Sequence, residues 1–147
     1  MEKEIIMSNK EYKYQIEETP STVSDVEMVY FINTVNIESR EFKFFKKLAQ
    51  KTDKIISEWF NISEKTFQNY KNLKTEISMP FKEKFLHLIA LYKKGELVFG
   101  SKEAFNTWLE TPNFQFNNSA PVDFFKSISG IRYIEDRLTG IEYGDNA

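Results

Sequence analysis

The apolar residues of this chain recur with the spacing of an α-helix from Glu38 onward, and this spacing restricts the fold more than any other feature. Phe42, Phe45, Leu48 and Ala49 follow one another at intervals that place them on one side of a helix, with lysines on the other side. Comparable stripes recur in later segments, and no run of alternating apolar residues competes with them. The sequence therefore predicts an all-α fold.

Caps and breaks divide the expected helices. Thr52 and Ser63 are suitable N-cap residues for two short helices, and Pro80 fits the first turn of a long one. We expect the long helix to run from Phe81 to about Val98 and to end at Gly100, a typical residue just beyond a helix. Its outer side is expected to carry four lysines, Lys82, Lys84, Lys93 and Lys94.

The segments beyond this helix are expected to be shorter. One helix is predicted from Ser101 to Leu109, and Pro112 ends it because proline cannot continue a helix. Another short helix is expected to begin at Pro121 or Val122. The pair Ser129-Gly130 predicts a further break, followed by a last helix from Ile131 to Leu138.

The N-terminal part is less informative. Residues 1–24 mix charges with small polar residues and suggest a flexible leader. Residues 25–33 are compatible with a short strand or with a helical turn, because the run is too short for its period to decide. We therefore expect three parts: an extension of unknown role over residues 1–38, a helix-turn-helix domain over 39–94, and a small helical domain over 95–147.

Charge is distributed unevenly along the chain, although the net charge is only −2. Residues 40–95 hold 13 Lys or Arg and 6 Asp or Glu, which gives +7. The preceding residues sum to −5 and the following ones to −4. A basic middle segment favours contact with a polyanion such as DNA, while the bland alternative is a solvated basic face.

Residues 52–72 have the form of a helix-turn-helix motif, with Ile62 as the buried residue of the turn. In this motif the second helix enters the major groove, where Asn and Gln can read adenine and Lys can read guanine. Glu64 is unusual there, because it can repel phosphate or accept a hydrogen bond from cytosine. A helical hairpin without a DNA role is the alternative. The predicted DNA-binding residues are Ser63, Glu64, Lys65, Thr66, Gln68, Asn69, Lys71 and Lys74.

Six short motifs in the last third of the chain occur in a characteristic order. They are Glu96–Ser101, Ala104–Leu109, Thr111–Asn113, Pro121–Phe125, Gly130 and Leu138–Gly144. Together they resemble the C-terminal toxin-binding domain of the Xre/MbcA/ParS-type antitoxins, which follows an Xre-like DNA-binding domain. Two departures from the family pattern are the bulky pair Phe124-Phe125 and the pair Asn117-Asn118, which replaces a glycine but tolerates the same left-handed backbone.

The resemblance implies an antitoxin of a type II toxin–antitoxin system. Its partner would be a RES-domain toxin that consumes NAD, and the C-terminal region would block the toxin's active site. The protein would also repress its own operon by binding operator DNA, as a homodimer or within a larger complex. The residues expected to contact the toxin are Arg132, Tyr133, Asp136, Arg137, Ile141, Glu142, Tyr143 and Gly144. An ordinary solvated helix face is the alternative for them, whereas Trp108 and Leu109 are expected in the core.

An enzyme is not expected. His87 is the sole histidine and cysteine is absent, so neither a metal site nor a Ser–His pair is indicated. No glycine-rich phosphate loop is present, and no cofactor is implied. The lack of an apolar run of membrane-spanning length and of a signal peptide favours a cytoplasmic protein. The alternative function is a helix-turn-helix transcriptional regulator whose C-terminal part serves dimerisation or effector binding, without a toxin partner.

Overall fold

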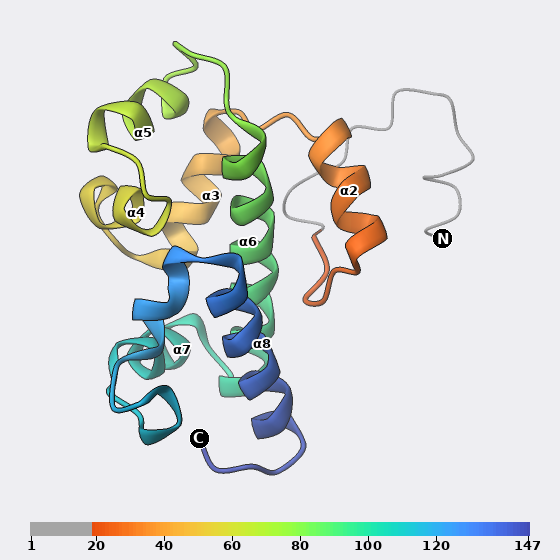
Figure 1. Cartoon of the computed structure of the whole chain (residues 1–147), viewed down its shortest axis with the longest axis vertical. Helices are drawn as coiled ribbons and strands as arrows, with labels where there is room; N and C mark the ends of the chain where they lie inside the picture. The colour runs from red at the N-terminus through yellow and green to blue at the C-terminus, as the bar shows by residue number, and fades with distance from the viewer. Residues whose placement is uncertain (1–18) are drawn as a thin grey trace.

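The computed structural model describes residues 19–147, and these residues fold into helices without a β-strand (Figure 1). The predicted all-α fold is therefore confirmed. The elements are α2 (Asp25–Thr34), α3 (Ser39–Ala49), α4 (Asp53–Trp59), α5 (Glu64–Lys71), α6 (Met79–Phe99), α7 (Lys102–Glu110), the 3-10 helices η2 (Phe114–Phe116) and η3 (Pro121–Lys126), and α8 (Ile128–Glu142).

The long helix α6 is the axis of the molecule. Ser78 caps its start by accepting a hydrogen bond from the Phe81 amide, and Gly100 ends it with a left-handed φ of 88°. In Figure 1, α3, α4 and α5 lie beside the first half of α6, α7 and α8 lie beside the second half, and α2 lies on the opposite side from α3–α5. Because neighbours surround it, α6 is buried on most of its circumference.

Aromatic side chains fill the core on both halves of α6. Phe45 of α3 lies 5.1 Å from Phe85 of α6, measured between ring centroids. Phe125 of η3 packs edge-on against Trp59 of α4 at 4.9 Å and against Tyr92 of α6 at 6.1 Å. Phe125 therefore connects the packing of the two halves, and the buried apolar residues form one continuous cluster.

Close packing of α7 against α6 depends on Gly95. A β-carbon at this position would overlap the Phe105 ring of α7, which is fully buried. The missing side chain thus lets the two helices approach each other, and this gain outweighs the lower helix propensity of glycine.

The start of α8 differs from the prediction. The expected break at Ser129-Gly130 is wrong, because α8 already begins at Ile128 and continues to Glu142, one turn beyond its predicted end. Ser127 is the N-cap, and its hydroxyl accepts from the Gly130 amide at 2.9 Å. Glycine is needed in this first turn because a β-carbon would overlap the carbonyl oxygen of Phe124.

Two of the four lysines expected on the outer side of α6 are buried. Lys84 and Lys94 are each 8% exposed. Lys84 donates to the carbonyls of Trp59 and Lys126, and Lys94 donates to the hydroxyl of Thr139 on α8. The aliphatic stems of both lysines are buried, while their ammonium groups reach polar partners on neighbouring elements. Helical spacing alone does not predict such partners.

Residues 25–34 form a helix, so the strand alternative is wrong. Ser24 and Glu27 make a capping box, and the buried side chains of Met28 and Phe31 belong to the core cluster. The leader prediction for residues 1–18 lies outside the described residues. Thr19 is buried, and its carbonyl accepts from Lys93 at 2.6 Å. None of the helices in residues 19–147 is long and apolar enough to span a membrane.

Candidate protein-binding and nucleic-acid-binding surfaces

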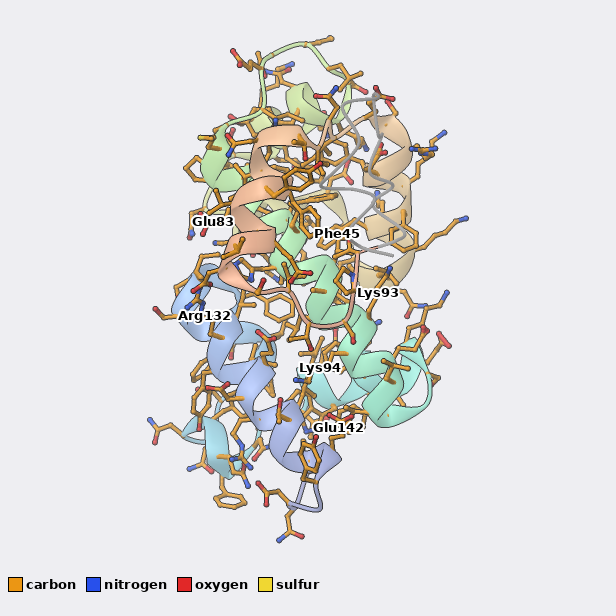
Figure 2. The ribbon with its side chains drawn as sticks, turned by 90° about the vertical axis from the view of Figure 1, so that its right-hand side faces the viewer. Phe45, Glu83, Lys93, Lys94, Arg132 and Glu142 are labelled. Carbon is orange, nitrogen blue, oxygen red and sulfur yellow. The ribbon has the colours of Figure 1, made fainter. Side chains whose placement is uncertain are left out.

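All eight residues expected to contact a toxin belong to α8 or to the segment directly after it. Ile134 and Leu138 point into the core. Arg132 and Asp136 are exposed, one turn apart on the outer side of the helix. Figure 2 shows Arg132 near one end of α8 and Glu142 at the other. Ten residues separate them, which corresponds to about 15 Å along the axis.

Tyr133 is fixed by its neighbours although its side chain is 39% exposed. Its hydroxyl donates to the carbonyl of Gln115 at 2.6 Å. Its ring stacks on Phe124 at 5.7 Å and meets Phe116 edge-on at 5.1 Å. Tyr133 therefore presents a rigid aromatic edge to solvent, and part of its role is to hold η2 against α8.

Tyr143 is the C-cap residue of α8 and is 84% exposed. Gly144 follows with a φ of 108°, a left-handed conformation that turns the chain back and that other residues rarely adopt. Arg137 lies 3.4 Å from the carboxylate of Asp145 in the turn that results. Ile141 is half-buried, whereas Glu142 is exposed.

The C-terminal tail contacts the η2 loop. Asn113 donates from its side-chain amide to the carbonyl of Ala147 at 2.9 Å, and Gln115 donates to the carbonyl of Asn146 at 3.5 Å. Phe114 of the same loop is 74% exposed. Sequence reasoning did not select Phe114, because nothing in its spacing distinguishes it from the core phenylalanines.

The turn between α4 and α5 is tightly defined. Asn61 adopts a left-handed φ of 56°, which asparagine tolerates better than most residues. Ser63 caps α5, and its hydroxyl accepts from the Thr66 amide at 3.0 Å. Phe67 and Tyr70 point inward, so the opposite side of α5 faces solvent.

The predicted DNA-binding residues differ in their exposure. Glu64, Lys65 and Lys74 are exposed, whereas Thr66, Gln68, Asn69 and Lys71 are half-buried. Lys71 is 2.6 Å from Asp53 at the start of α4, so its charge is already paired within the protein. Lys65 and Lys74 are the cations of this set that the structure leaves facing solvent.

A polar junction built around the buried Lys84 joins this turn to η3. The carbonyl of Lys126 accepts from the side-chain amide of Asn61 at 2.8 Å and from the ammonium of Lys84 at 2.9 Å. Lys84 also donates to the carbonyl of Trp59 at the end of α4, at 2.8 Å. Burial lowers the pKa of Lys84, and these carbonyls at the ends of two helices offset part of that penalty.

Comparison with known proteins gives one family match. Residues 94–144 match the family described as the antitoxin Xre/MbcA/ParS C-terminal toxin-binding domain. No curated protein sequence matches the chain. The matched range includes α7, η2, η3, α8 and Tyr143, and its description names binding to a toxin. The match confirms the resemblance of the C-terminal motifs to this antitoxin family, and it supports an antitoxin role for the chain in a toxin–antitoxin system.

Proposed function

We propose that this chain is the antitoxin of a type II pair and that it neutralises a RES-type, NAD-consuming toxin. Its C-terminal region would lie against the toxin and block the active site. The observation that carries the proposal is the match of residues 94–144 to a toxin-binding domain. The geometry of α8 and of the tail after it is compatible with this role.

The exposed aromatic side chains near the tail support a protein interface. Phe114, Tyr133 and Tyr143 are all exposed, and tyrosine is enriched among the residues that contribute most to protein–protein binding. Tyr133 is held by its hydroxyl, and the tail is held by Asn113. Because these contacts exist before a partner arrives, less conformational entropy is lost on binding.

We further propose that α4, its turn and α5 act as a helix-turn-helix that binds operator DNA and represses the operon, with the protein acting as a homodimer or in a larger complex. Lys65 is exposed near the start of α5, and Gln68 and Asn69 lie one turn further along. The capped start of α5 and Lys74 would lie near phosphates. Lys71 contributes less than its charge suggests, because Asp53 pairs with it.

The first test is co-expression with a neighbouring gene for a RES-type toxin. The full chain should restore growth and co-purify with the toxin, whereas a variant lacking residues 141–147 should not restore growth. The truncated protein should keep its helical circular dichroism, because the deleted side chains are mostly exposed. Full protection by the truncated form would show that the tail does not block the active site. Absence of a toxin partner would favour the regulator alternative.

DNA binding is tested separately. Lys65→Ala and Asn69→Ala should each weaken binding to the operator by about 1–3 kcal/mol in a shift assay at fixed salt, while growth rescue remains. Lys102→Ala on α7 is the matched control, since it removes a lysine far along the chain from α5. Equal effects of Lys65→Ala and the control would place the DNA-binding surface elsewhere.

A further inference from the structure

A cavity of about 420 Å³ lies where the start of α2 meets α6 and α8. It is lined by Val23, Ser24, Asp25, His87, Arg132, Glu135 and Asp136. Figure 2 shows Arg132 on α8, below the end of α2 at which Asp25 lies. The cavity adjoins the outer side of α8, which carries the residues proposed to contact the toxin.

The charged groups of this cavity are not balanced. Three carboxylates face one guanidinium, which leaves a formal charge of −2. Arg132 is already paired with Asp25 at 2.9 Å. Within residues 19–147, the carboxylates of Glu135 and Asp136 make no hydrogen bond or ion pair, and burial raises the pKa of Glu135. The charges of Lys94 and Arg132 offset part of this effect on Glu135, and the cavity still holds more carboxylates than its one guanidinium can pair.

His87 lines the same cavity and has a ring nitrogen without a hydrogen-bond partner among the described residues. The side chain is 7% exposed, and its buried Nε2 has no hydrogen-bond partner within the described part of the chain. Burial lowers the pKa of His87, and the positive charge of Arg132 adds to this effect, so the imidazole is neutral near pH 7. A neutral imidazole with its proton on Nδ1 offers Nε2 as an acceptor. In that tautomer, Nε2 is a buried acceptor without a donor.

We propose that this cavity binds the guanidinium group of an arginine side chain on the partner protein. A guanidinium carries only donors, arranged in a planar fork that can serve two carboxylates together. An anion is disfavoured by the charge of the lining. A metal ion is disfavoured because no group of three His, Asp or Glu side chains is placed to bind one within residues 19–147.

The proposed function identifies the partner as the toxin, and the inference rests on the proposed function in this respect. It also gives a role to the N-terminal extension, for which the sequence indicated none. The first turn of α2 supplies one wall of the cavity, and Asp25 in that turn lies 2.9 Å from Arg132 of α8.

The first test uses His87 as a probe, because it is the sole histidine and its imidazole proton signals are unambiguous in NMR spectra. Addition of N-acetyl-arginine-amide to the full chain should shift these signals saturably, with a dissociation constant on the order of 1–10 mM. Asp136→Asn and Glu135→Gln should each weaken this binding about fivefold, the size of a single ion pair. Asp123→Asn, an exposed carboxylate of η3, should leave it unchanged. A shift that does not saturate, or that all three variants reduce equally, would overturn the proposal.

The second test is co-purification with the toxin. Glu135→Lys should weaken capture of the toxin at least tenfold, whereas Asp123→Lys should not. If the wild-type chain captures the toxin and Glu135→Lys captures it equally well, the cavity proposal fails while the proposed function stands. If the wild-type chain captures no toxin, the proposed function fails, and the titration with N-acetyl-arginine-amide still decides whether the cavity binds a guanidinium.

Discussion

Replacement of Lys84 by methionine tests whether the junction between the α4–α5 turn and η3 stabilises the molecule. Methionine has nearly the length of lysine, so the packing of the aliphatic stem is retained while the ammonium group is lost. The change removes the donor to the carbonyls of Trp59 and Lys126. The Lys126 carbonyl keeps the amide of Asn61, at 2.8 Å, but the Trp59 carbonyl is left without a donor.

The magnitude follows from these partners. A buried carbonyl without a donor costs about 1–3 kcal/mol, and a hydrogen bond from a charged donor contributes about 1.5–3 kcal/mol. Removal of the buried charge recovers part of this loss, because burial disfavours the charged form of Lys84 and lowers its pKa. We expect Lys84→Met to lower the free energy of unfolding by about 2 kcal/mol, which corresponds to a decrease of about 4–8 °C in Tm.

Urea denaturation followed by tryptophan fluorescence and by circular dichroism measures this loss. Trp59 is in α4 and Trp108 is in α7, so fluorescence reports on both sides of the junction. The two signals should change in one transition, because the core is continuous. Asn61→Gly keeps the left-handed backbone but removes the amide, and its effect should couple to that of Lys84→Met by about 0.5–1 kcal/mol.

A change in stability of less than about 0.5 kcal/mol for Lys84→Met would refute this reasoning, since surface substitutions lie in that range. It would show that water satisfies the two carbonyls when the lysine is absent. Two separate transitions in the wild-type chain would show that the segments before and after residue 94 unfold independently in spite of the shared core.

Three further substitutions test other parts of the structure. Gly95→Leu should destabilise the protein by about 2–3 kcal/mol, because the new side chain overlaps the Phe105 ring. Leu97→Ala, on the exposed side of the same helix, should change stability by less than about 0.5 kcal/mol. Thermal denaturation of the two variants measures the difference. Ser127→Ala should cost about 1 kcal/mol by removing the N-cap of α8, and an unchanged urea midpoint would contradict that role. For Asp53, burial alone would raise the pKa of the carboxyl, but its two lysine partners outweigh burial and hold the pKa below its usual range. The resulting stability is present above the usual pKa of aspartate, about 4, and is lost as pH falls through the lower folded-state pKa. Asp53→Asn should therefore cost about 1 kcal/mol at pH 7, and the cost should shrink as the carboxyl is protonated at acid pH, as measured by urea denaturation over a pH series.

The sequence predicts much of the fold because its local rules are strict. Helical spacing identifies α3 and α6, and cap residues such as Ser63 and Ser101 begin helices where expected. The predicted break at Ser129-Gly130 is wrong for a packing reason. Glycine inside a pattern usually signals a break, but here it permits close approach of the Phe124 carbonyl to the first turn of α8.

The order of the C-terminal motifs is specific enough to indicate an antitoxin family, and the family match over residues 94–144 agrees with this prediction. Which of the predicted contact residues are available to a partner was not readable from the sequence. Lys71 and Arg132 are both cations on helices, yet each is paired with an aspartate that is distant in sequence.

By itself, the sequence determined the helical class, most helix ends and the resemblance of the last third to a toxin-binding domain, because spacing, caps and motif order are properties of neighbouring residues. The tertiary structure alone decided that α2 meets α8, that Lys84 connects two helix ends, and that His87 lies beside unpaired carboxylates. These features depend on which helices pack side by side. Packing brings together residues such as Asp25 and Arg132, which are 107 positions apart, and no local rule relates such residues.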